Sequence, residues 1–112
     1  MEELAKVSSE IFVKKMVSHL ESAYSKELRE HVGLLQNPQQ FVRSGLKKAM
    51  SYGISYEENV QLYLECMVEL GANFDTDPEI LWASNILQNR NQTGEEKMDA
   101  IEEHLTFLAM SK

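Results

Sequence analysis

The sequence predicts an all-α protein, a compact single-domain bundle of about five helices that occupies residues 1–112. Apolar residues recur at spacings of three and four along most of the chain, which is the period of an amphipathic helix, and no stretch shows sustained alternation. Glycines, prolines and capping residues divide the chain into segments of helical length. With 112 residues, of which 43% are hydrophobic, the chain has the size and composition of one globular domain.

The first helix is expected to begin after Ser8 or Ser9 and to run to about Tyr24. Its apolar residues return every four positions and form one face: Phe12, Met16, Leu20 and Tyr24, with Val13 and Val17 beside them. A short turn of helix is expected around residues 26–32. It would end near Gly33, because a glycine tolerates the positive φ that suits a helix stop.

The second main helix is predicted to start at Asn37-Pro38-Gln39-Gln40. Asparagine can cap a helix, proline fits the first helical position, and the second glutamine stands where a capping box returns its side chain. This helix is expected to stop at Gly53. The residues expected to point inward are Phe41, Val42, Leu46, Ala49 and Met50.

A third helix is predicted from Ser55-Tyr56-Glu57-Glu58 to Gly71. In this capping box Ser55 accepts from the backbone near Glu58, and the Glu58 side chain reaches back. Apolar residues cover most of the helix surface, which is typical of a central helix contacted on several sides. Its polar stripe consists of Glu58, Gln61, Glu65 and Glu69.

Two more helices complete the bundle. Residues 72–77 are expected to form a loop anchored by Phe74, after which Asp77-Pro78 starts a helix that runs to about Gln88. Its apolar face comprises Leu81, Trp82, Ile86 and Leu87. A third capping box, Thr93-Gly94-Glu95-Glu96, starts the last helix, which carries a narrow seam of Met98, Ile101, Leu105 and Leu108. That seam suits a dimer contact as well as a core, which leaves a homo-oligomer open.

The net charge of −7 is concentrated in the second part of the chain. Residues 1–52 hold eight Lys or Arg and six Asp or Glu, whereas residues 53–112 hold three and twelve. Such a surface repels nucleic-acid phosphates and anionic lipid and attracts a basic protein surface. The charge is equally compatible with an acidic face that only aids solubility.

A soluble, cytoplasmic protein is expected. The single cysteine, Cys66, cannot form an intramolecular disulfide, which is usual in a reducing compartment. The first ten residues carry three acids and no apolar run of the kind an export signal requires. No apolar run is longer than four residues, the length of residues 80–83, which is too short to cross a membrane.

No catalytic residue, cofactor or metal is predicted. Residues 75–79 alternate acids as an EF-hand loop does, but its sixth and twelfth positions are Ile80 and Ile86. A match to a nucleophile elbow at residues 53–57 fails at Glu57, where glycine is required. Cys66 lies among the apolar residues of the predicted third helix and is interpreted as a small apolar side chain. Glu65 and Glu69 beside it are unfavourable for a thiolate. The three histidines fall on separate segments, without the spacing of zinc ligands: His19, His31 and His104.

Several segments carry a resemblance to a known family: Ala49-Met50-Ser51-Tyr52-Gly53-Ile54, Glu69-Leu70-Gly71, Asn73-Phe74-Asp75-Thr76-Asp77-Pro78, Trp82-Ala83 and Ile86-Leu87. They resemble a small helical module of bacterial type VI secretion. That module is found at the C-terminal end of adaptor or chaperone proteins that load effectors onto the secretion spike, and in short proteins encoded beside effectors. The resemblance runs from about Phe41 to Leu108 and implies protein binding without catalytic residues.

The leading hypothesis is a non-enzymatic adaptor or chaperone that holds an effector before export; the alternative is an immunity protein that neutralises a cognate toxin. The expected partner is an effector, a toxin or a secretion-spike component, with no nucleic acid and no membrane. Two hypotheses come from other functional classes: a small enzyme with an unrecognised site and a helical transcription regulator.

The residues expected to contact a partner are Glu58, Glu65, Glu69, Asp75, Asp77 and Trp82. Trp82 is interpreted either as a core pillar or as an exposed interface anchor.

Overall fold

Every regular element that the computed structural model describes, over residues 9–23 and 38–110, is helical. The α-helices are α1 (Ser9–Ala23), α3 (Pro38–Ser51), α4 (Glu57–Leu70), α5 (Leu81–Leu87) and α6 (Gly94–Met110), and two 3-10 turns, η1 (Phe74–Thr76) and η2 (Pro78–Ile80), precede α5. The prediction of an all-α bundle of about five helices is therefore confirmed. None of the described helices is long and apolar enough to cross a membrane.

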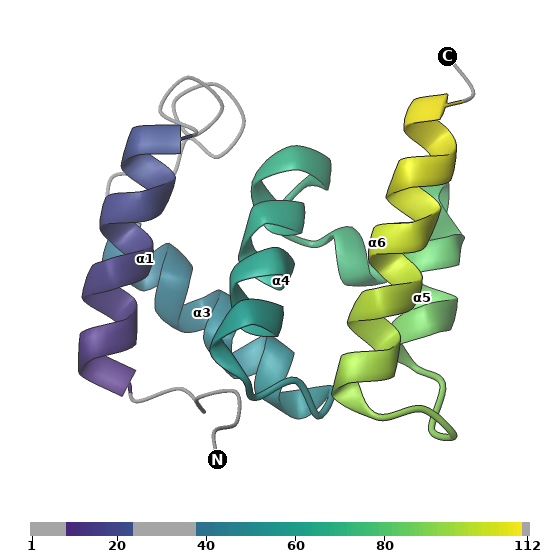
Figure 1. The fold of residues 1–112 in the computed structure, drawn as a ribbon, viewed down its shortest axis with the longest axis horizontal. Coiled ribbons are helices and arrows are strands. Elements are labelled where there is room, and N and C mark those ends of the chain that lie inside the picture. Colours follow the sequence, from purple (N-terminus) through teal and green to yellow (C-terminus); the bar gives the residue numbers. More distant parts are fainter. Residues whose placement is uncertain (1–8, 24–37, 111–112) are drawn as a thin grey trace.

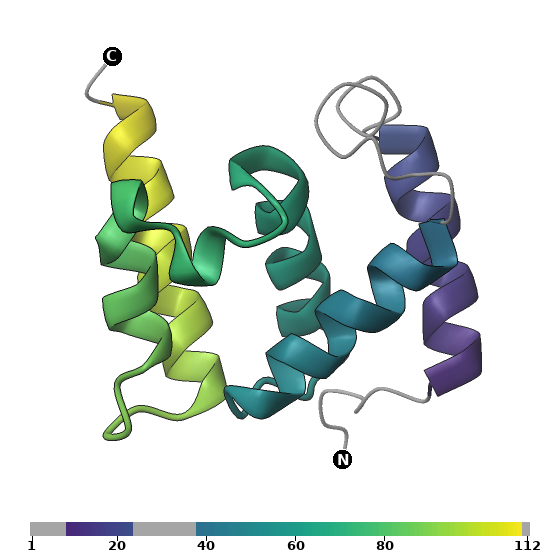
Figure 2. The ribbon, with the colours of Figure 1, turned by 180° about the vertical axis from the view of Figure 1, so that it is seen from behind.

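Helix α4 lies in the middle of the bundle, as its wide apolar surface predicts. Figure 1 shows α1 and α3 on one side of it and α5 and α6 on the other, and Figure 2 shows the same order from behind. It packs against α1, α3, α6 and η1. Its buried residues are Val60, Tyr63, Leu64, Cys66, Met67 and Val68.

The core face of α1 agrees with the predicted four-residue repeat. Phe12, Val13, Met16 and Leu20 are buried, and Val17 packs at the edge of the core. Tyr24, the expected turn at residues 26–33 and the Asn37 cap lie outside the described residues.

Two residues that were expected to point inward are exposed. Met50 is 51% exposed, because it lies beside the buried face of α3 and points toward solvent. That face consists of Phe41, Val42, Gly45 and Ala49. Leu81 is 58% exposed. The chain after Asp77 forms a 3-10 turn before α5 begins, so the register changes and Ala83 and Leu87 become the buried pair.

The last helix confirms one capping box. The Thr93 amide donates to Glu96 Oε1 at 2.9 Å, and the Glu96 amide donates to Thr93 Oγ1 at 3.1 Å. Within the seam, Met98 and Ile101 are buried, Leu105 is half-buried and Leu108 is exposed. The seam therefore enters the core only along the first half of α6.

The capping box predicted at Ser55 and Glu58 is wrong. Helix α4 begins at Glu57, and its N-cap is Tyr56, whose side chain makes no cap hydrogen bond. The buried Ile54 explains this start, because its amide donates to the Ala49 carbonyl and closes the turn after α3. The turn places Ser55 one residue too early to cap.

Gly94, at the start of α6, lies directly against the turn between α3 and α4. A Cβ atom there would collide with the Gly53 carbonyl and approach the Ile54 Cα to 2.8 Å. These are backbone atoms, which cannot turn aside as a side chain can. Glycine at this position therefore lets two segments that are far apart in the sequence meet backbone to backbone.

We expect Gly94→Ala to lower the free energy of unfolding by about 2–3 kcal/mol, because overpacking forces backbone movement. Urea denaturation followed by circular dichroism measures the change. The matched control is Glu95→Ala, which alters an exposed residue in the same turn and should stay within about 0.5 kcal/mol of the wild type. Equal stability of Gly94→Ala and Glu95→Ala would contradict this close contact.

Candidate protein-binding surface

The six residues predicted to contact a partner do not form one surface. Glu58 and Glu69 are exposed on α4, at its first and last turns. Glu65 is half-buried and faces α1, where its Oε2 lies 2.8 Å from His19 Nε2 and 3.3 Å from Gln61 Nε2. The Glu65 side chain therefore connects α4 to α1.

Asp75 is inside the protein and does not join the exposed acidic face. It is 5% exposed, and its Oδ2 accepts a hydrogen bond of 2.7 Å from the Tyr52 hydroxyl. Lys48 Nζ lies 3.7 Å from Asp75 Oδ1 and donates to Asn73 Oδ1 at 2.8 Å. These contacts fasten η1 to the end of α3.

Asp77 acts locally as the cap of η2, where its Oδ1 accepts a hydrogen bond from the Glu79 amide at 2.8 Å.

The Tyr52 phenol is held in its neutral form. Burial raises its pKa to about 12, and the hydrogen bond to Asp75 and the charge of that carboxylate act in the same direction. Tyr63 lies beside it, with ring centres 6.3 Å apart, and burial also raises the Tyr63 pKa. The neighbourhood of Asp75 thus stays protonated at both tyrosines and serves as a hydrogen-bonded support.

We expect Tyr52→Phe to lower the free energy of unfolding by about 1–3 kcal/mol, because it removes the hydrogen bond to the buried Asp75 carboxylate. Urea denaturation measures this loss. Tyr56→Phe is the matched control, since the Tyr56 hydroxyl makes no hydrogen bond with described residues and its removal should change stability by less than about 0.5 kcal/mol. A Tyr52→Phe protein as stable as Tyr56→Phe would show that the bond adds nothing.

Cys66 behaves as a core residue. It is 1% exposed on α4. Burial, followed by the charges of Glu69 and Glu65, raises the pKa of its thiol from 9.0 to about 12. The sequence-based interpretation of Cys66 as a small apolar side chain agrees with this position.

The raised pKa of Cys66 predicts a loss of stability in alkaline solution. Above pH 9 the unfolded chain releases the thiol proton while the folded chain retains it, so the free energy of unfolding falls as pH rises toward 12, by up to about 1.4 kcal/mol per pH unit. Urea denaturation between pH 8 and 11 measures the slope. Cys66→Ala should give a shallower slope, and identical slopes for the two proteins would contradict the prediction.

Among the residues predicted to contact a partner, Trp82 belongs to a row of aromatic rings at the surface between α5 and α6. Its ring is half-buried on α5 and stacks on the ring of His104 from α6, with centres 4.1 Å apart and planes inclined by 23°. Phe107 follows on α6, with its ring centre 6.3 Å from that of His104. We call Trp82, His104 and Phe107 the aromatic edge. One part of Trp82 packs on the core and another part reaches the surface, and its role as an interface anchor stays a prediction.

The aromatic edge continues into exposed apolar residues. Phe107 is 63% exposed and Met110 is 79% exposed, at a spacing of three that places them on neighbouring positions of α6. Helix α6 also carries five acidic residues against one lysine. Aromatic and methionine side chains within a charged rim are characteristic of protein interfaces.

Sequence reasoning missed His104 and Phe107. Both lie beside the predicted seam of α6, but a spacing rule assigns residues to a helix face and does not show which neighbour covers that face. Phe107 was the available signal, because a large aromatic residue outside the predicted seam of Met98 and Ile101 suggests an exposed contact surface. The neighbours of Phe107 depend on α5, which is short and does not extend as far as the C-terminal end of α6 (Figure 1).

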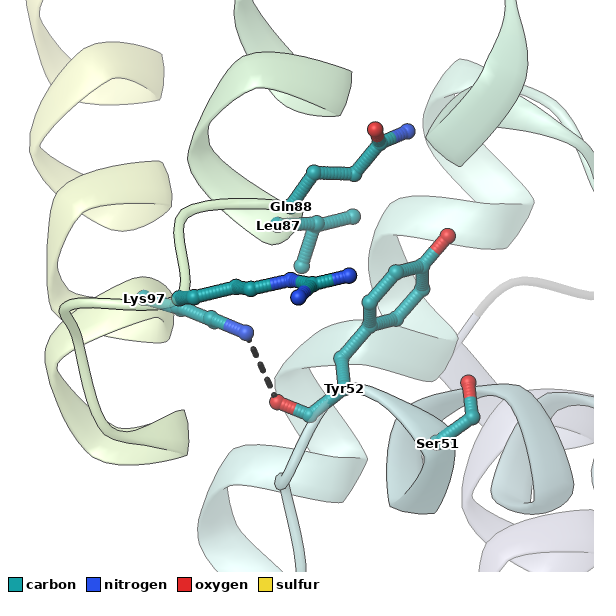
Figure 3. A pocket seen from close by; sticks show the side chains of 6 residues that line it. Ser51, Tyr52, Leu87, Gln88 and Lys97 are labelled. Carbon is teal, nitrogen blue, oxygen red and sulfur yellow. Dashed lines mark hydrogen bonds between the residues drawn. The ribbon is translucent and has the colours of Figure 1, made fainter.

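A separate hollow of about 280 Å³ opens where the ends of α3 and α5 meet the start of α6 (Figure 3). Its lining consists of Ser51, Tyr52, Leu87, Gln88, Arg90 and Lys97. Lys97 Nζ donates to the Tyr52 carbonyl at 3.0 Å and lies 5.8 Å from the centre of the Tyr52 ring. Lys97 therefore ties α6 to the end of α3.

Comparison of the chain with models of known protein families, with curated proteins and with solved structures found no match. Within residues 9–23 and 38–110, no three His, Cys, Asp or Glu side chains gather as metal ligands would.

Proposed function

We propose that this protein is a non-enzymatic protein-binding module that acts as an adaptor or chaperone for a type VI secretion effector. The observation that carries the binding role is the aromatic edge together with Met110: the half-buried Trp82 and His104 lead to the exposed Phe107 and Met110 on a helix with five acids and one lysine. The secretion role rests on the resemblance of the segments between Ala49 and Leu87 to modules of that system.

The aromatic edge favours a partner of complementary chemistry. Phe107 and Met110 offer apolar anchors, and Glu103, four residues before Phe107, places a negative charge on the same side of the helix. The matching surface has apolar side chains between lysines or arginines. Charge complementarity of this kind speeds encounter and excludes acidic competitors.

Phe107→Ala tests this surface with an effector encoded beside the protein in its bacterial host. We expect the variant to bind the purified effector at least about thirtyfold more weakly by isothermal titration calorimetry, since a central aromatic anchor contributes about 2 kcal/mol or more. Its stability should stay close to that of the wild type, because the side chain is exposed.

Ile11→Ala is the matched control, because Ile11 is an exposed apolar residue of similar exposure, 67%, on α1 at the other side of α4. It should bind the effector as the wild type does. Equal affinities of the wild type and Phe107→Ala would overturn the proposed surface. If the two affinities are equal, light scattering of the protein alone measures whether it is a dimer, in which a second copy of this chain would cover the aromatic edge.

A deletion strain separates the adaptor from the immunity protein. Loss of an adaptor stops effector delivery into a recipient cell and leaves the producing cell healthy. Loss of an immunity protein poisons the producing cell, and this result would replace the first proposal by the alternative.

A further inference from the structure

The hollow beside Tyr52 has a positively charged lining in a strongly acidic protein. Of its six lining residues, Lys97 and Arg90 are basic and none is acidic, whereas the whole chain has 18 acidic and 11 basic residues. The Tyr52 ring gives the hollow an apolar side, and Leu87 is buried behind its surface (Figure 3). A cavity of this composition favours an anion with a small apolar body.

Lys97 supplies the second observation, because its charge is buried without a counter-ion. The residue is 7% exposed, and no described carboxylate lies within ion-pairing distance of either Lys97 or Arg90. The Tyr52 carbonyl, just beyond the end of α3, takes one of its three N–H donors and offsets part of the cost of burial. A buried ammonium is far more stable with an ion partner than without one.

The other polar side chains add donors to the same space. Gln88 uses one amide N–H to donate to Ser84 Oγ at 2.9 Å and keeps a second N–H. The exposed Arg90 presents a planar guanidinium, which pairs with carboxylate or phosphate oxygens in a two-point geometry. The Ser51 hydroxyl already donates to the Lys48 carbonyl at 2.6 Å, so it is available as an acceptor rather than as a donor.

We propose that the hollow lined by Lys97, Arg90 and Tyr52 binds a small organic oxyanion, a carboxylate or phosphate monoester attached to a short apolar group. The oxyanion supplies the missing charge for Lys97 and Arg90, and the apolar group packs on the half-buried Tyr52 ring. A volume of 280 Å³ has room for on the order of ten water-sized groups, enough for a single-ring ligand. This binding does not depend on the proposed protein partner.

Phenyl phosphate is the probe, with inorganic phosphate and neutral benzyl alcohol for comparison, each added at constant ionic strength to the ¹⁵N-labelled protein. We expect phenyl phosphate to shift the amide resonances of Ser51, Tyr52, Gln88, Arg90 and Lys97 in a saturable manner, inorganic phosphate to bind several-fold more weakly, and benzyl alcohol to cause no shift. Absence of shifts at these amides would overturn the proposal. Equal binding of phenyl phosphate and benzyl alcohol would overturn the role of the two cations.

A pair of charge-matched variants completes the test. Arg90→Gln should weaken phenyl phosphate binding by about tenfold, the loss expected for one charge-assisted contact. Arg43→Gln removes the same charge from α3, where Arg43 pairs with Glu10 at 3.1 Å, and should leave binding unchanged. Equal weakening by both variants would show a general effect of net charge and would contradict the site. Arg90 is chosen because it is exposed, whereas Lys97 also holds α6 to α3.

Discussion

Tyr52 connects segments that are far apart in the chain. Its hydroxyl donates to the buried Asp75 of η1, its carbonyl accepts from Lys97 of α6, and its ring lies beside Tyr63 of α4. The next residue, Gly53, lies against Gly94. The placement of α5 and α6 against the rest of the bundle therefore depends on the turn between α3 and α4, where several polar contacts are satisfied at once.

The acidic residues of this protein have different tasks in different places. Asp75 is buried with Tyr52 and Lys48, Glu65 joins α4 to α1 through His19, and Asp77 and Glu96 cap turns of helix. The acids of α6 are exposed, and Glu103 lies one turn before Phe107 of the aromatic edge. A high content of Asp and Glu in the sequence thus corresponds to several separate roles, and α6 combines exposed acids with the exposed Phe107.

Much of the fold was predictable because helical periodicity and capping are local properties. The four-residue repeat of α1 and the reciprocal bonds of Thr93 and Glu96 depend on residues within one or two turns. Met50, Leu81 and Ser55 were predicted wrongly for other reasons. Met50 lies inside α3 but beside its buried face, which only the packing of α3 on its neighbours defines. Ser55 and Leu81 depend on where a helix begins: the N-cap of α4 lies one residue after the predicted cap, and the 3-10 turn at Pro78 delays the start of α5 to Leu81.

The sequence by itself determined that the chain is helical, that α4 is the central helix and that Cys66 belongs to the core, because apolar spacing alone decides which faces avoid water. It also identified Trp82 as a residue with two interpretations. Only the tertiary structure decided that Asp75 is buried, that His104 and Phe107 extend the surface at Trp82, and that Lys97 lines a hollow with no acid among its described lining residues. Each of these facts depends on contacts between residues more than twenty positions apart, which no local pattern encodes.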